Sequence, residues 1–196
     1  MDIIKEDANK KYIGQNRYLK RSSVNINRNA NLLLNPYYLG LWLGDGFTNS
    51  SSIINEDSEV ISWLSKYADD MGMTLSVTST KSNAVELYIK NKKHNHKNPI
   101  KEALKYYNIL SKKDIPDEYV YASVEDKLEL LAGLIDTDGS FNKRDRIYTF
   151  SQCVQRKHIV DKMAFIARQL GFKCSTFLYK TSGTKCINRN KNISKC

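Results

Sequence analysis

The chain has 196 residues, of which 41% are hydrophobic and 27% charged, and these values fit a folded protein of one large domain or two small ones. No stretch approaches the roughly 18 apolar residues that a membrane helix needs, and the polar N-terminus has no signal-peptide core. The formal net charge of +10 favours nucleic acid as the partner over an anionic membrane surface, because no basic amphipathic helix is evident.

The first part of the chain predicts two helices and a strand. After a polar, basic stretch over 1–34, the run YYLGLWLGDGF (37–47) predicts a helix that ends in Asp-Gly. Apolar residues at i, i+4 and i+8 then predict an amphipathic helix that Gly72 stops. The alternation in AVELYIK (84–90) predicts a strand that points Val85, Leu87 and Ile89 toward a core.

The second part repeats this design. The run LLAGLIDTDGSF (130–141) predicts another helix that ends in Asp-Gly, and HIVDKMAFIARQLG (158–171) predicts an amphipathic helix that a glycine stops. Strands are predicted within 146–153 and 175–181. All four cysteines lie in this region without a C-x-x-C pair, so we expect reduced thiols in an intracellular protein, nuclear or cytoplasmic.

The two copies align closely enough to predict the architecture. Matching Gly46 to Gly139 places Asp45 on Asp138 and Gly40 on Gly133. Each copy reads as a helix, strands, an amphipathic helix and further strands, which predicts an α+β fold with two pseudo-symmetric αββαββ-type halves in one chain. We place the halves at 35–126 and 127–196 and expect a monomer that behaves as a pseudo-dimer.

The acids at the ends of the two Asp-Gly helices need an explanation. A helix C-terminus carries partial negative charge, so acids there are unfavourable. Small residues at Gly40, Gly44, Ala132 and Gly133 would let the helices pack closely and bring the acids together. Two converging carboxylates without Cys or His ligands favour Mg²⁺, with Mn²⁺ or Ca²⁺ as substitutes. The alternative is that both are ordinary Asp-Gly helix ends.

These residues resemble a known family. LAGLIDTDG (131–139) differs at one position from the motif that names the LAGLIDADG homing endonucleases, and YLGLWLGDG (38–46) resembles the first motif of double-motif members carried in inteins. The resemblance implies two halves that form a DNA-binding saddle and a site-specific double-strand DNA endonuclease. It assigns metal binding and catalysis to Asp45 and Asp138, and we place Gly44 and Thr137 at the metal as well. We interpret Asp136 as non-catalytic, because Leu43 stands at its matching position.

The same resemblance identifies a catalytic lysine. Intein-type members have a lysine before an x-Ile-Pro turn, and SKKDIPDEY places Lys113 there. A second such lysine is expected late in the other half, where Lys185 or Lys195 takes the role or the segment is missing. Residues 1–34 are interpreted as a linker, a remnant of a splicing region or a DNA-contacting arm.

DNA recognition is expected on the polar faces of the strands and on nearby basic residues. In the first half the expected contacts are Thr48, Ser50, Ser52, Lys81, Tyr88, Lys90, Lys92 and Lys93. In the second half they are Lys143, Arg144, Arg146, Tyr148, Gln152, Gln155, Arg156 and Lys157. The resulting hypothesis is a metal-dependent endonuclease that cuts double-stranded DNA at a long asymmetric site. The alternatives are a decayed or truncated DNA-binding module of the same fold and an RNA-splicing maturase.

Overall fold

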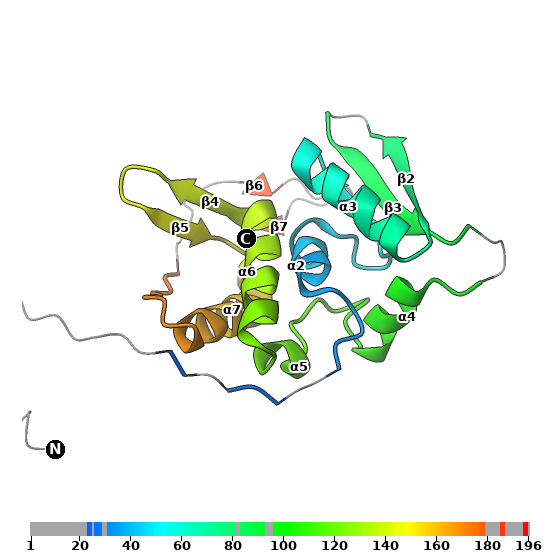
Figure 1. Cartoon of the computed structure of the whole chain (residues 1–196). Helices are drawn as coiled ribbons and strands as arrows, with labels where there is room; N and C mark the ends of the chain where they lie inside the picture. The colour runs from blue at the N-terminus through cyan, green and yellow to red at the C-terminus, as the bar shows by residue number, and fades with distance from the viewer. Residues whose placement is uncertain are drawn as a thin grey trace, which may run out of the picture.

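A computed structural model describes residues 23–24, 26–28, 31–80, 83–92 and 96–178, together with the backbone of two short strands at 185–186 and 194–195 (Figure 1). The first part contains α2 (Pro36–Asp45), β1 (Ile53–Asn55), α3 (Ser58–Asp70), β2 (Thr74–Ser79), β3 (Val85–Lys90) and α4 (Pro99–Tyr106). The second part contains α5 (Asp117–Val120), α6 (Val124–Asp138), β4 (Gly139–Asn142), β5 (Ile147–Phe150), a 3₁₀ turn (Val154–Arg156), α7 (Lys157–Gln169), β6 (Lys185–Cys186) and β7 (Ser194–Lys195).

The two predicted Asp-Gly helices are α2 and α6. Asn35 caps α2 by accepting a 3.0 Å hydrogen bond from the Tyr38 amide, and Pro36 occupies the first turn, where a missing N–H does no harm. Ser123 caps α6 through a 3.0 Å bond from the Asp126 amide. Both helices end at an aspartate that a glycine follows, as predicted.

Helix α2 is the centre of the hydrophobic core. Leu39, Leu41, Trp42 and Leu43 are all 0% exposed, although α2 is only ten residues long. Figure 1 shows α2 between α6 on one side and α3 with its sheet on the other. A helix that is apolar all round is stable only where neighbours cover every face, and this explains its weak amphipathic pattern.

The sheet of the first part is three-stranded and antiparallel, in the order β1-β3-β2. Leu87 of the central strand pairs with Ile53 on one side and Val77 on the other. Leu87 and Ile89 are buried and Val85 packs against the core, so the predicted orientation of this strand is confirmed. Helix α3 packs on that apolar face, and Gly72 follows it with a φ of 67°, which a glycine adopts without strain.

The second part has smaller sheets and one more strand before its amphipathic helix. The αββαββ order predicted for both halves is found in the second, whereas in the first only β1 lies between α2 and α3. Strands β4 and β5 pair antiparallel, as do β6 and β7, where Lys185 lies opposite Lys195. Helix α7 is followed by Gly171 at a φ of 88°, as the repeat predicts. The strand predicted within 175–181 is wrong for its described residues, 175–178, which are exposed and do not form a strand. The chain is thus α+β, and no described helix is long and apolar enough to cross a membrane.

The segment before α2 lies against the second half. The Val24 amide donates a 2.8 Å hydrogen bond to the Gln169 carbonyl, and the Arg28 guanidinium lies 4.0 Å from the centre of the Tyr121 ring. The buried Lys127 ammonium donates 2.8 Å bonds to the Ile26 carbonyl and to the Gln169 side chain. In the stretch predicted as a linker or arm, residues 1–22, 25 and 29–30 lie outside the described residues.

Candidate functional site

The site begins with the contact between α2 and α6. A Cβ placed on Gly40 would lie 2.5 Å from the Leu130 carbonyl oxygen and 2.8 Å from the Leu134 amide nitrogen. A Cβ on Gly133 would lie 2.9 Å from the Leu41 amide and closer still to the Tyr37 carbonyl oxygen. The two backbones are therefore in direct contact through the matched glycines, as predicted. Ala132 is exposed, so its predicted place in this contact is wrong, because it projects from the other side of α6.

The contact continues to the C-terminal ends of the helices. A Cβ on Gly44 would lie 2.6 Å from Thr137 Cβ and 3.2 Å from Asp138 Oδ2, so the end of α2 touches the last turn of α6. Asp45 follows Gly44 directly and comes within electrostatic range of Asp138. The predicted pair of acids thus meets at one place, together with two negative helix ends.

The surroundings make these carboxylates hard to ionise. Burial raises the pKa of Asp45, and the neighbouring Asp138 carboxylate raises it further. Burial likewise raises the pKa of Asp138, against the opposing effect of the positive Lys113 and Arg156. A carboxylate partly removed from water is destabilised unless a cation or hydrogen-bond donors compensate.

Each acid receives one side-chain amide. Asn55, at the end of β1, donates a 2.9 Å hydrogen bond to Asp45 Oδ2. Gln152, just after β5, donates to Asp138 Oδ2. Gln152, which was also expected as a DNA contact, is half-buried beside the acid. Because each amide occupies one carboxylate oxygen, both carboxylates are held in a fixed orientation.

Lys113 supplies the positive charge that two helix ends and two acids require. It is only 4% exposed, and its Nζ donates hydrogen bonds of 3.0 Å to the Leu43 carbonyl and 3.1 Å to the Gly44 carbonyl. These carbonyls belong to the last turn of α2, which has no intrahelical donors for them. Burial lowers the pKa of Lys113 to about 7, the positive Arg156 lowers it too, and Asp138 and Asp45 act in the opposite direction.

Helix α7 fixes the segment that carries Lys113. His158 Nε2 lies 2.8 Å from the Lys113 carbonyl oxygen. Lys162 Nζ donates a 2.6 Å bond to the Ile115 carbonyl and lies 3.0 Å from Asp114 Oδ2. The lysine is therefore held from both halves of the chain, through its ammonium by α2 and through its backbone by α7.

The donor set fits a small hard cation. Two carboxylates and the carbonyl oxygens of the helix ends are the oxygen ligands that Mg²⁺ accepts, and Mg²⁺ usually keeps several waters. Thr137 directs its hydroxyl to the Gly133 and Leu134 carbonyls at 3.0 and 3.1 Å, so the group it could offer a metal is its backbone carbonyl. The Gly44 carbonyl already accepts the hydrogen bond from Lys113 and could offer a metal only its second lone pair. Within the described ranges no group of three or more His, Cys, Asp or Glu side chains is arranged so that it could hold a metal ion.

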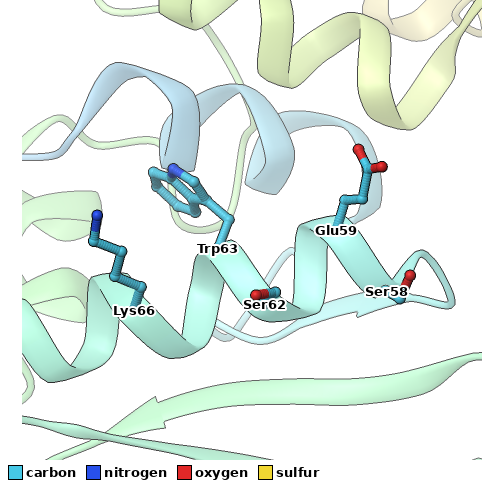
Figure 2. Close-up of a pocket in the computed structure, with 5 residues that line it drawn as sticks. All are labelled: Ser58, Glu59, Ser62, Trp63 and Lys66. Atoms are coloured by element: carbon cyan, nitrogen blue, oxygen red, sulfur yellow. The ribbon is translucent and has the colours of Figure 1, made fainter.

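Asp136 lies apart from this arrangement. Its carboxylate is exposed and accepts a 2.7 Å hydrogen bond from the Tyr37 hydroxyl. The Tyr37 ring packs edge-on against Trp63 of α3, with ring centres 4.6 Å apart. Figure 2 shows Trp63, Glu59 and Lys66 projecting from α3. These side chains help to line a hollow with a volume of about 430 Å³. Neither Asp45 nor Asp138 lines this hollow.

The expected DNA contacts of the first half differ in how exposed their side chains are. Thr48 and Ser50 are half-buried, and their loop is anchored by Trp42 Nε1, which donates a 2.8 Å bond to the Ser50 carbonyl. Ser52 is buried and shares a 2.9 Å hydroxyl hydrogen bond with Ser50, which it supports. Tyr88 is half-buried in β3, and its hydroxyl accepts a 3.3 Å bond from Asn98. The basic residues Lys90 and Lys92 are exposed, while Lys81 and Lys93 lie outside the described residues.

The expected contacts of the second half are mostly exposed. Tyr148 is 65% exposed on β5, with its ring 4.6 Å from that of Phe141. Arg156 is half-buried near Asp138 and Lys113. The other expected contacts are exposed. Lys143, Arg144 and Arg146 lie in the turn between β4 and β5, Gln155 lies in the 3₁₀ turn, and Lys157 begins α7, where it forms a 2.6 Å ion pair with Asp161.

Sequence reasoning missed Asn55, His158 and Lys162. Asn55 lies 10 residues after Asp45, whereas Gln152 lies 14 residues after Asp138, so no shared spacing marks the two amides. His158 and Lys162 act on a segment more than 40 residues away, and their spacing is that of one helix face. Only the folded arrangement identifies them.

Comparisons with known proteins give a family match over the second part of the chain and a relative over most of its length. Residues 114–195 match the model of a family described as homing endonuclease. The chain is also 29% identical over 171 residues to a replicative DNA helicase DnaB of Mycobacterium intracellulare. That match covers 85% of this chain and 25% of the helicase, so the chain spans about a quarter of this relative. The family match, which includes all of α5, α6 and α7, supports a homing endonuclease.

Proposed function

We propose that this chain is a double-motif LAGLIDADG-type homing endonuclease, carried in an intein, that cuts both strands of a long asymmetric DNA site. The observation that carries the proposal is the meeting of Asp45 and Asp138 at the ends of two helices in backbone contact, beside the buried Lys113. One chain provides both acids, which favours a monomer that acts as a pseudo-dimer. The intein setting is supported by the match to one quarter of a longer helicase, which is compatible with an insertion in a host protein.

The residues divide the chemistry between them. Asp45 and Asp138, with the backbone carbonyls of Gly44 and Thr137, would hold Mg²⁺, which Mn²⁺ or Ca²⁺ replaces in the site. When bound, the metal supplies an activated water and charge stabilisation at the leaving oxygen. Asn55 and Gln152 orient the carboxylates, as their hydrogen bonds indicate. Lys113 places positive charge where a scissile phosphate develops negative charge.

The decisive experiment is a plasmid-cleavage assay with Mg²⁺. The substrate carries a replicative helicase gene without the insertion, and its cleavage is compared for the wild type, Asp138→Asn and Asp136→Asn. We expect the wild type and Asp136→Asn to linearise the plasmid. Asp138→Asn should bind the same site without cutting it, because it keeps the side-chain volume but loses the charge.

The outcomes separate the alternatives. Cleavage by Asp138→Asn at the wild-type rate would contradict the metal site. A wild type that binds the site specifically but leaves it intact would favour a decayed DNA-binding module. Selective binding of a folded intron RNA in place of the duplex would favour a maturase.

A further inference from the structure

The face of the first sheet that α3 leaves open contains a polar cavity. The cavity has a volume of about 320 Å³ and is lined from β2, from β3, from the loop after Asp45 and from Lys101 of α4. In the antiparallel register Thr78 lies opposite Glu86 and Ser76 lies opposite Tyr88. Since successive side chains alternate between the two faces of a sheet, these four side chains lie together on the face that points away from Leu87 and the core.

Glu86 is an unusual residue for this surface. Among the described residues that line the cavity it alone is acidic, in a chain of net charge +10. Its carboxylate forms no hydrogen bond or ion pair with any described side chain, although it is half-buried. On a surface that meets a polyanion, an unpaired acid weakens binding through phosphate repulsion unless it finds a donor on the partner.

The backbone around Glu86 is rigid. It lies in the central strand and pairs with Ile54 of β1 and Thr78 of β2. A residue hydrogen-bonded through its strand on both sides cannot shift far, which is the condition for a contact that discriminates between bases.

We propose that Glu86 is a specificity-determining residue that accepts a hydrogen bond from the N4 amino group of a cytosine in the major groove. This proposal rests on the proposed DNA-binding function. An ionised carboxylate only accepts hydrogen bonds. In the major groove cytosine presents a donor, guanine presents two acceptors, thymine presents an acceptor and a methyl group, and adenine presents its donor beside an acceptor. Cytosine is therefore the base that a carboxylate fits best.

The test is a selection from double-stranded oligonucleotides with a randomised central tract, in EDTA so that no DNA is cut. The wild type is compared with Glu86→Gln and with Glu118→Gln, a matched control on α5 that removes the same charge from an exposed position. We expect the wild type to enrich cytosine about tenfold at one position. Glu86→Gln should replace cytosine by adenine at that position alone, because a glutamine amide bonds to adenine N6 and N7 together.

The result also separates this proposal from the function on which it rests. Glu118→Gln should retain the wild-type profile, and all three proteins should show the same circular dichroism spectrum. A Glu86→Gln profile identical to that of the wild type would overturn the role of Glu86 while leaving sequence-specific binding established. If the wild type itself enriches no sequence, the endonuclease proposal fails and the reading of Glu86 fails with it.

Discussion

The contact between α2 and α6 can be tested by adding one methyl group. In Gly40→Ala the new Cβ would lie 2.5 Å from the Leu130 carbonyl oxygen, where ordinary contact begins at 3.4 Å, so the helices would have to separate by about 0.9 Å. Because the obstacle is backbone, it cannot move aside as a side chain would. An obstacle that cannot move puts the cost of overpacking in the upper part of its usual range, about 2–3 kcal/mol, and the better helix propensity of alanine returns about 1 kcal/mol. We expect a net loss of about 1–2 kcal/mol in unfolding free energy.

Thermal denaturation followed by circular dichroism measures this loss. For a chain of this size each kcal/mol lowers Tm by about 2–4 °C, so Gly40→Ala should lower it by roughly 2–8 °C. Ala132→Leu is the control, because it adds a larger group to the exposed side of α6 and should leave Tm within about 1–2 °C of the wild type. A Tm equal to or above that of the wild type in Gly40→Ala would refute the backbone contact, since only the gain in helix propensity would then remain.

Three further sets of substitutions test Lys113 beside the two acids, the exposed lysines of the first half, and the buried Lys127 of α6. Lys113→Met should reduce cleavage about a hundredfold or more while specific binding persists, and undiminished cleavage would remove Lys113 from the chemistry. Changing Lys90 and Lys92 together to alanine should reduce the slope of log affinity against log salt by about 2. An unchanged slope would mean that these lysines face away from the duplex. Burial lowers the pKa of Lys127 in the folded chain below its ordinary value of 10.5. Between these two pKa values the unfolded chain binds more protons than the folded chain, so this group makes the free energy of unfolding rise with pH. Chemical denaturation from about pH 8 to about pH 10 should therefore show the wild type gaining stability relative to Lys127→Met, and a constant difference would contradict the shift.

Much of the scaffold was predictable because its causes are local. Apolar spacing and a terminating glycine define α3 and α7 within their own segments, and Asp57 also caps α3, so these helices appear where the sequence places them. The matched Gly40 and Gly133 predicted close helix packing, because two glycines at one position of a repeat indicate a shared backbone contact. The acids after them follow from the same alignment, since each ends its helix.

The remaining parts of the site depend on contacts that no short segment contains. Lys113 reaches the Leu43 carbonyl across 70 residues, and its burial follows from the packing of both halves around the end of α2. Gln152 looked like a surface residue on a polar strand, yet the turn of the chain after β5 brings it to Asp138. Ala132 looked like its neighbour Gly133, but one step along a helix rotates a side chain by about 100°, and this puts it in solvent. Local sequence patterns therefore account for α2, α3, α6 and α7, the repeat and the two acids. The packing of distant segments selects the polar side chains that surround those acids, because that choice depends on distances between segments far apart in the chain.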